Sequence, residues 1–281
     1  MTGFPSSSDG ASARPALVGL ATTSVYPEPA EEAFRQAAEL GYDGVEVMVW
    51  SDPVSRDADA LLELAATYAV PVMSVHAPTL LLTQGVWGRD NWARLVRTAE
   101  HAEALGAQTV VVHPPFRWQR TYGAGFEEGI AALGEEHHCT FAVENMFPWR
   151  VGGRDVQAYA PGWDLLDHGY EHCTLDFSHA ATARQDSMQL LEVLGDRVRH
   201  LHLTDGSGSL MDEHLVPGDG TQPVAEVLQK LAAAGWDGHT VVEINTRRDK
   251  ANRVDALRRS LEFARRHLAG GGRPAAANLR R

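Results

Sequence analysis

Histidine and acidic residues stand at the end of almost every short apolar segment in this 281-residue chain. The segments read, for example, Ser-Val-His76, Val-Val-His113 and Ala-Val-Glu144. Imidazole nitrogens and carboxylate oxygens are donors that bind zinc, manganese, iron or cobalt in proteins. The residues that end these segments are therefore candidate metal ligands, and they are Glu46, His76, His113, Glu144, Asp176, His202 and Glu243.

Two further pairs of donors lie close together in the sequence. Asp176-Phe-Ser-His179 places two donors within one turn as the chain leaves an apolar segment, and Asp212-Glu-His214 places two donors on one side of an extended loop. Both spacings allow two side chains to bind the same ion. Each donor taken alone is more simply explained as a polar side chain at a strand end, so the metal hypothesis depends on the whole set.

The order of the secondary-structure elements explains how residues so far apart in the sequence could meet. Short segments rich in Val, Leu and Thr alternate with stretches of helical periodicity, a pattern typical of strand-helix units around a parallel sheet. The predicted strands are 17–20, 44–48, 72–75, 109–112, 140–143, 174–175, 199–203 and 240–244. The predicted helices are 29–40, 57–68, 91–105, 125–136, a short one at 164–168, 187–194, 223–234 and 251–268.

Eight such units predict a single (β/α)8 TIM barrel over residues 15–269, an α/β fold that commonly needs about 250 residues. The segments 1–14 and 270–281 are predicted to be disordered tails. The carboxyl ends of barrel strands surround one axis, so the donors would form one ring. Glu144, Asp176 and Glu243 would then repel one another unless cations lay among them. The sequence therefore predicts a site for one or more divalent ions.

The composition narrows the class of ligand. A formal net charge of −12 disfavours a protein that binds nucleic acid through phosphate contacts, because such binding relies on clustered Lys and Arg. The sequence shows neither a membrane-spanning apolar run nor a signal-peptide pattern, so we expect a cytoplasmic protein that acts on a small molecule. Cys139 and Cys173 are expected to be buried free thiols.

Loop residues beyond the strand ends are candidates for substrate contacts. The arginines that could hold a phosphate or carboxylate, or form ordinary loop salt bridges, are Arg117, Arg120, Arg150 and Arg154. The tryptophans that could pack on a sugar ring, or simply cover the barrel mouth, are Trp50, Trp87, Trp118 and Trp149. Glu46 and Asp205 are also expected to contact substrate. His200 is expected to face the helices and to have no role.

The order of these motifs resembles the metal-binding barrel family that joins endonuclease IV with the xylose isomerase-like sugar isomerases and epimerases. The resemblance covers roughly residues 17–268. Its most specific part is Asp212-Glu-His-Leu-Val-Pro-Gly-Asp-Gly220, which follows His202-Leu-Thr-Asp205. The chain is similar to proteins called sugar phosphate isomerase/epimerase. It lacks the lysine that classical xylose isomerase uses near its metals, so the resemblance is to the wider family.

The isomerase branch of this family implies one divalent ion, with Zn or Mn first and Fe or Co as further candidates. The matching ligands are Glu144, Asp176, His202 and Glu243. Glu144 or Glu243 would take a proton from the carbon between two chelated sugar oxygens and return it through a metal-bound enediol, while His179 orients a substrate oxygen. The resemblance thus implies an isomerase or epimerase of a small sugar, sugar phosphate or polyol, and the fold suggests a homodimer.

The endonuclease IV branch implies a different use of the same residues. There the matching positions bind three zinc ions, which activate a hydroxide against a phosphodiester. This sequence keeps all of the residue types, which are His76, His113, Glu144, Asp176, His179, His202, Asp212, His214 and Glu243. A zinc-dependent phosphoesterase is therefore the alternative, and a non-catalytic metal-binding barrel is a third hypothesis. The shortage of basic residues around the strand ends favours the isomerase.

Overall fold

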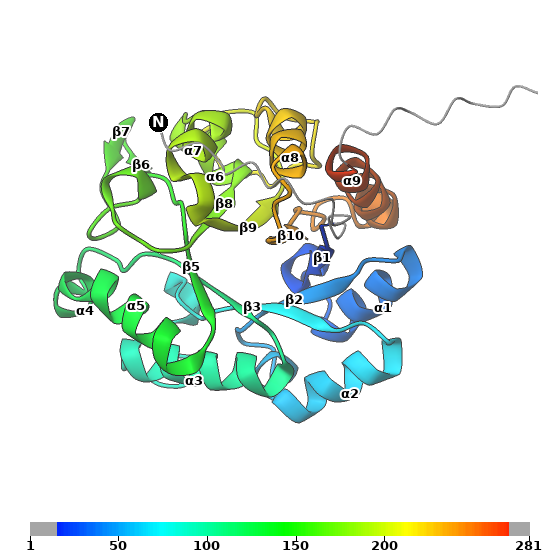
Figure 1. The fold of residues 1–281 in the computed structure, drawn as a ribbon, viewed down its shortest axis with the longest axis horizontal. Coiled ribbons are helices and arrows are strands. Elements are labelled where there is room, and N and C mark those ends of the chain that lie inside the picture. Colours follow the sequence, from blue (N-terminus) through cyan, green and yellow to red (C-terminus); the bar gives the residue numbers. More distant parts are fainter. Residues whose placement is uncertain (1–15, 270–281) are drawn as a thin grey trace, which may run out of the picture.

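Parallel strands close into a barrel in the computed structural model, which describes residues 16–269. The strands pair in the order β1-β10-β9-β8-β5-β4-β3-β2, as Figure 1 shows around the centre of the molecule. They are β1 (Val18–Ala21), β2 (Gly44–Met48), β3 (Val72–His76), β4 (Thr109–Val112), β5 (Thr140–Glu144), β8 (Cys173–Asp176), β9 (Val198–Leu203) and β10 (His239–Val242). The predicted (β/α)8 fold is confirmed. The predicted tails, 1–14 and 270–281, lie outside the described residues.

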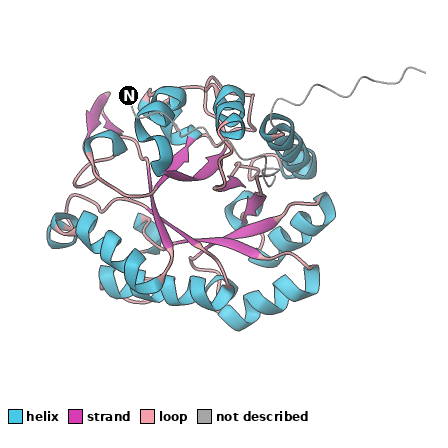
Figure 2. Ribbon diagram, viewed as in Figure 1, coloured by secondary structure: helices cyan, strands magenta, loops and turns pink. Residues whose placement is uncertain are grey.

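Helices surround the barrel, as the cyan ribbons outside the magenta strands show in Figure 2. The α-helices are α1 (Ala30–Leu40), α2 (Ala58–Tyr68), α3 (Asn91–Leu105), α4 (Arg120–Ala124), α5 (Phe126–His137), α6 (Phe177–Ala183), α7 (Ser187–Leu194), α8 (Val224–Ala233) and α9 (Arg253–Leu268). The 3-10 helices are η1 (Thr22–Val25), η2 (Val54–Arg56), η3 (Leu81–Thr83), η4 (Leu165–Asp167), η5 (Gly195–Arg197) and η6 (Lys250–Asn252). Within residues 16–269, every helix is too short or too polar to cross a membrane.

Several helix boundaries follow capping residues that are visible in the sequence. The side chain of Asp90 accepts a hydrogen bond from the amide of Ala93 at 2.9 Å and so caps the start of α3. Helices α1 and α3 end at Gly41 and Gly106, whose φ angles of 85° and 71° are left-handed and suit glycine. These local signals explain why the predicted limits of α1 and α3 lie within one residue of the observed ones.

The predicted pattern misses two features near the barrel mouth. A hairpin follows β5, formed by antiparallel β6 (Trp149–Val151) and β7 (Arg154–Val156), and its turn residues Gly152 and Gly153 both have positive φ. Helix α6 begins directly after Asp176, whose Oδ1 accepts a hydrogen bond from the amide of His179 at 2.7 Å. The Asp176-Phe-Ser-His179 spacing is therefore a helix cap as well as a pair of potential ligands.

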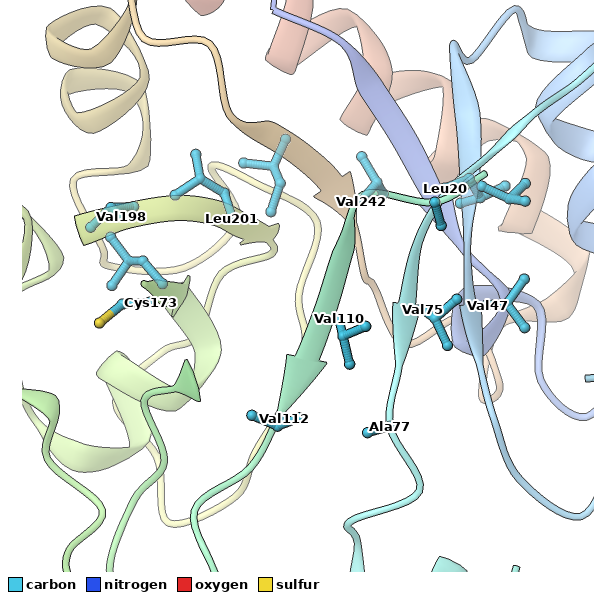
Figure 3. Packing of buried hydrophobic residues seen from close by; sticks show 14 of the residues in the cluster. Leu20, Val47, Val75, Ala77, Val110, Val112, Cys173, Val198, Leu201 and Val242 are labelled. Atoms are coloured by element: carbon cyan, nitrogen blue, oxygen red, sulfur yellow. The ribbon is translucent and has the colours of Figure 1, made fainter. Parts of the chain in front are cut away.

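Alternate residues of each strand face the helices and form the hydrophobic core. In β2, Val45 and Val47 belong to this core, while Glu46 between them is buried on the other side of the strand. Figure 3 shows the same core built by Val75, Val110 and other labelled residues of neighbouring strands. Because side chains alternate along a strand, the intervening residues point toward the barrel axis. The barrel thus separates an apolar outer core from an interior that carries polar side chains.

His200 belongs to this interior, and the expectation that it faces the helices is wrong. Its ring is fully buried, and its Nε2 lies 2.9 Å from Oε2 of Glu46. Residues two apart on a strand point to the same side, so His200 shares the side of His202. The free thiols of Cys139 and Cys173 are buried, as the sequence predicts.

The cap of α3 gives a test of the fold. We expect Asp90→Ala to lower the free energy of unfolding by about 1 kcal/mol, because the amides at the start of α3 lose their side-chain acceptor. Arg89→Ala, an exposed neighbour outside the helix, is the control and should change stability little. Urea denaturation followed by circular dichroism measures both. Equal stability of the two variants would contradict the capping role.

Candidate metal centre

Histidine and carboxylate side chains from six strands meet at the carboxyl ends of the barrel. His179 comes from α6, and Asp212 and His214 come from the loop after β9. These three residues lie beside the donors at the strand ends. The nine ligands that the family resemblance predicts therefore belong to one connected group of side chains. The members of this group are His76, His113, Glu144, Asp176, His179, His202, Asp212, His214 and Glu243.

The centre of this group is what we call the central donor set, made of Glu144, Asp176, His202 and Glu243. One donor atom from each residue lies within 4.8 Å of the others. His202 Nδ1 is 2.8 Å from Oε1 of Glu144 and 3.0 Å from Oε2 of Glu243. Oδ2 of Asp176 is buried and lacks a hydrogen-bond partner among the described residues. Leaving a carboxylate oxygen buried in this way is unfavourable, and a cation at this point would satisfy it.

A second group, the His76 set, shares Glu144 with the central donor set. It consists of His76, His113 and Glu144. The Nε2 atoms of His76 and His113 lie 3.2 and 2.8 Å from the same oxygen, Oε2 of Glu144. Both rings are buried and meet edge to face at 4.7 Å. Two imidazole nitrogens converging on one carboxylate oxygen are well placed to share an ion with it.

A third group, the His214 set, shares Asp176 with the central donor set. It consists of Asp176, His179 and His214. Oδ2 of Asp212 lies 3.3 Å from Nε2 of His179 and 3.0 Å from Nε2 of His214. Its other oxygen accepts a hydrogen bond from Ser178 at 2.6 Å. Asp212 is therefore held in place beside both imidazoles.

The orientation of the imidazole rings is fixed from outside the site. An imidazole that binds a metal through one nitrogen usually donates the other N–H to a carboxylate or carbonyl. Acceptors for such an N–H lie about 3 Å from the outer nitrogens of most of these rings. The contacts are His76 Nδ1 to Ala77 O at 3.1 Å, His179 Nδ1 to Asn145 O at 2.9 Å, His214 Nδ1 to Glu243 O at 2.8 Å and His202 Nε2 to Glu46 Oε1 at 2.9 Å.

Burial and close charges decide which groups carry protons before any metal binds. Burial alone would raise the pKa of Glu144, but His202 and the other neighbouring imidazoles hold it well below its usual range. Burial would lower the pKa of His214, but Asp212 beside it raises that pKa to about 10. Burial would raise the pKa of Glu243, but His202 lowers it to about 2. At neutral pH the carboxylates are therefore ionised and His214 carries a proton.

These donors fit a divalent transition metal. Three carboxylates and one imidazole in the central donor set mix oxygen and nitrogen, a combination that suits zinc, manganese, iron or cobalt. Calcium and magnesium prefer oxygen donors alone. An ion at this place would satisfy Oδ2 of Asp176, which lacks a hydrogen-bond partner among the described residues. It also agrees with the hydrogen bonds that hold the outer nitrogens of the imidazole rings. The identity of the metal stays a prediction.

A pocket of about 240 Å³ opens beside Glu243, at the ends of β1, β2 and β10. Thr23 donates a hydrogen bond to Oε1 of Glu243 at 3.0 Å, and Tyr26 meets Trp50 edge to face at 4.8 Å. The guanidinium of Arg247 lies 5.3 Å from the centre of the Tyr26 ring. A larger cavity, of about 450 Å³, lies along α5 and is lined by residues outside the donor group. Of these two cavities, the smaller is lined by members of the donor group, His214 and Glu243.

The surroundings of Glu46 and Asp205 contradict the prediction that these two side chains contact substrate. Glu46 is 1% exposed and lies beneath His202, with its oxygens beside His200, His202 and Ser74. Asp205 is fully buried and accepts hydrogen bonds from backbone amides of the loop that carries the Pro-Gly-Asp-Gly segment. Both carboxylates are already occupied by the protein. Glu46 supports a donor residue, and Asp205 holds a loop.

Among the predicted loop contacts, Trp50 lines the 240 Å³ pocket, while Arg117, Arg120 and Trp118 lie on the opposite rim. Trp118 is 51% exposed and stacks on Phe116 at 4.6 Å. Arg117 is exposed and donates a hydrogen bond to the carbonyl of Gln157, and Arg120 begins α4 at the surface. These three stay predictions as substrate contacts. Arg150 forms a loop salt bridge, because its Nε lies 2.9 Å from Oδ1 of Asp155. Arg154 is exposed on the same hairpin.

Sequence reasoning missed most of the pocket wall. Thr23 and Tyr26 follow β1, and Asn245 and Arg247 follow β10. Their position directly after strand ends was a usable signal, because loops at that end of a barrel build the site. Their residue types carry no metal-binding chemistry, so a search for donors passes over them.

Comparisons with known proteins agree with this fold. An uncharacterized protein of Mycobacterium tuberculosis is 51% identical over 277 residues, which cover 91% of this chain and 99% of that protein. Fructoselysine 3-epimerase of Escherichia coli O157:H7 is 24% identical over 81% of this chain and 90% of that protein. A crystal structure of the protein IOLI with a bound zinc atom covers 90% of this chain and 98% of its own, with a TM-score of 0.66 and 15% identity.

The fold and the site together define a (β/α)8 barrel with clustered donor side chains at the carboxyl ends of its strands. The model of the xylose isomerase-like TIM barrel family matches residues 34–267. The chain belongs to this family.

The protonation of the site predicts a proton release when metal binds. Burial opposes a charge on His202, but Glu144 and Glu243 raise its pKa well above the usual range, so the ring is protonated at pH 7. An imidazole must lose that proton to bind a metal. Isothermal titration of Zn²⁺ into metal-free protein, in buffers of different protonation enthalpy, should show proton release at pH 7. Affinity should rise between pH 7 and 9, and a pH-independent affinity would contradict this assignment.

Proposed function

We propose that this protein is a divalent-metal-dependent isomerase or epimerase that acts on a small sugar, sugar phosphate or polyol. The observation that carries the proposal is that Glu243 belongs to the central donor set and also faces a small pocket with aromatic walls. The epimerase among the relatives, although only 24% identical, supports the same class of reaction. The net charge of −12 supports a small substrate in preference to nucleic acid.

The residues that would hold the ion are those of the central donor set, Glu144, Asp176, His202 and Glu243. Bound there, a divalent ion would draw electron density from a substrate carbonyl oxygen and the neighbouring hydroxyl oxygen, and would make the hydrogen on the hydroxyl-bearing carbon beside the carbonyl more acidic. The protein's own part is to hold the donors in position and to move the proton. The zinc atom in the structure of IOLI supports zinc as one candidate, and manganese, iron and cobalt are the others.

Glu243 is the residue that we propose takes the proton. It is ionised at neutral pH, since the His202 imidazole outweighs the effect of burial on its pKa, and its Oε1 is held by the hydroxyl of Thr23. Glu144 belongs to a strand across the barrel and is also ionised. Removal of the carbon-bound proton by one carboxylate gives an enediol. Return of a proton by the same carboxylate to the neighbouring carbon gives an isomer, and return by the other carboxylate to the opposite face of the first carbon gives the epimer.

The groups around the two carboxylates would position the substrate. The aromatic side chains of Tyr26 and Trp50 line the pocket and would give the apolar side of a sugar a surface to pack on. Arg247 has no acidic partner among residues 16–269 and would suit a phosphate or carboxylate at the far end. His179, whose Nε2 faces Asp212, would orient a substrate oxygen. A pocket of about 240 Å³ suits a substrate of this size class.

A second candidate, a zinc-dependent phosphoesterase of the endonuclease IV type, is favoured by one specific observation. The His76 set and the His214 set flank the central donor set and share Glu144 and Asp176 with it. A single ion has no use for so many donors. The isomerase proposal gives the surplus imidazoles a different task, which is to bind substrate hydroxyls or a phosphate. Metal stoichiometry separates these two uses.

Elemental analysis of the purified protein is the decisive measurement for the number of ions. For the isomerase we expect about one ion per chain, because one ion suffices to polarise the substrate. That ion should persist in His76→Ala and Asp212→Ala and be lost in Asp176→Asn. In the last variant the amide oxygen can still cap α6, while the amide nitrogen would face the donor set.

The opposite result would support the phosphoesterase. A content of about three zinc ions per chain that falls in both His76→Ala and Asp212→Ala would contradict a mononuclear isomerase. Glu262→Gln, an exposed change on α9, serves as the control for handling losses.

Proton transfer itself can be followed by deuterium exchange. Wild-type protein loaded with Zn²⁺ or Mn²⁺ should exchange a carbon-bound hydrogen of its substrate with D₂O, tested by NMR on ketohexoses, their phosphates and cyclic polyols. Glu243→Gln should slow that exchange by about 10²- to 10⁴-fold, because the base is removed while an oxygen donor remains. Exchange at the wild-type rate with normal metal content would exclude Glu243 as the base.

A further inference from the structure

A fully buried pair of side chains, Glu46 and His200, lies directly beneath the central donor set. Oε1 of Glu46 accepts a hydrogen bond from Nε2 of His202 at 2.9 Å. Its Oε2 lies 2.9 Å from Nε2 of His200 and accepts a hydrogen bond from Ser74 at 2.6 Å. Glu46 is 1% exposed, and the other three residues are 0% exposed. The proton-transfer steps proposed above make no use of this pair.

The position of Glu46 is unusual for a barrel interior. Branched apolar side chains usually fill the layers inside a TIM barrel, and here the neighbours of Glu46 on β2, Val45 and Val47, serve the outer core. A carboxylate held away from water loses its hydration, so it must be compensated by close partners. Glu46 has such partners on both oxygens. A side chain needed only to fill space would not require them.

We propose that Glu46 and His200 are positioning residues for the metal ligand His202. An imidazole has two nitrogens, and only the one without hydrogen can bind a metal. Because Oε1 of Glu46 accepts the hydrogen of Nε2, Nδ1 is the nitrogen that faces Glu144, Asp176 and Glu243, and it is Nδ1 that gives up its proton when an ion binds. The ring is thus presented with the correct nitrogen and in the correct plane before the ion arrives.

His200 and Ser74 complete the arrangement by holding Glu46 itself. A carboxylate with one free oxygen could rotate about its terminal bond and tilt the hydrogen bond to His202. Oε2 of Glu46 is instead fixed by the Ser74 hydroxyl from β3 and lies against the His200 ring from β9. Parallel pairing of neighbouring strands places Glu46 beside Ser74 on β3, and His200 precedes His202 on the same face of β9. The positioning pair therefore belongs to the rigid barrel and not to a loop.

The same three side chains, Glu46, His200 and His202, also lie close enough to hold an ion of their own. The hydrogen bonds decide against that use. Oε1 of Glu46 already accepts a hydrogen bond from His202 and Oε2 accepts one from Ser74, while Nε2 of His200 lies 2.9 Å from Oε2. Both carboxylate oxygens are therefore engaged by the protein. An ion bound between Glu46 and His200 would overturn the proposal.

The test compares zinc affinity and His202 tautomer in wild-type protein and in Glu46→Gln. Affinity is measured for metal-free protein by competition with a chromogenic zinc chelator. Long-range ¹H–¹⁵N spectra of the zinc-loaded protein report which nitrogen of His202 carries hydrogen. We expect wild type to show hydrogen on Nε2 and zinc on Nδ1. In Glu46→Gln we expect an affinity about 10- to 100-fold lower. Glu128→Gln, an exposed change on α5, should match wild type.

Two milder variants keep the proposal testable if Glu46→Gln does not fold. Ser74→Ala and His200→Gln leave both Glu46 and His202 in place and remove one support of the carboxylate each. Each should weaken zinc binding by a smaller factor than Glu46→Gln while the melting temperature of the metal-free protein stays near that of wild type. A lowered melting temperature with unchanged zinc affinity would show that the pair only fills the barrel, and would overturn the proposal.

The inference rests on the metal centre of the proposed function, and the two can fail separately. If wild-type protein binds no zinc or manganese at all, the metal centre itself is wrong. If wild type binds zinc and Glu46→Gln binds it equally well with the same His202 tautomer, only the positioning role is wrong.

Discussion

The gathering of buried carboxylates at one end of the barrel is the constraint on which the rest of this structure depends. Glu144, Asp176 and Glu243 come within a few ångströms of one another in a region that excludes water. Their mutual repulsion must be balanced by positive charge. Protonated imidazoles supply it in the metal-free protein, since the pKa of His202 is raised well above its usual value by these carboxylates. A divalent ion in their place would meet the same requirement with better directed bonds.

The barrel can meet this constraint because strand geometry sorts side chains by position. Alternate residues of each strand join the apolar core against the helices, so the intervening residues can be polar without disrupting it. Short hydrogen-bonded segments then position the donors outside the strands, which are His179, Asp212 and His214. Asp176 caps α6 and so brings His179 to the site, while Asp205 gathers the amides of the loop that carries Asp212 and His214. The rigid strands fix the central donor set, and these two segments place His179, Asp212 and His214 beside it.

The sequence predicts the donors well because donor chemistry and strand ends are both local patterns. Thr109–Val112 and Gly44–Met48 have the predicted bounds, and the predicted ligands meet in space. Other features depend on contacts between distant segments. The role of Glu46 is invisible until β2 and β9 are known to face each other across the barrel, and the pocket wall formed by Tyr26 and Arg247 depends on how two loops fold together. The wrong prediction for His200 had a simpler cause. Residues two apart on a strand share a face, but the prediction placed His200 and His202 on opposite faces.

The direction from which a substrate reaches the donors follows from where aromatic side chains close the barrel. A small buried cluster lies over the ends of β4 and β5 and consists of Phe116, Met146, Ala158 and Tyr159. Phe147 packs against this cluster, and the centre of its ring lies 5.1 Å from that of the His179 ring. That cluster lies beside the His179 ring. On the opposite side Glu243 meets the 240 Å³ pocket. Substrate selection by this protein should therefore reside in the loops after β1, β2 and β10, because these are the loops that face the accessible carboxylate.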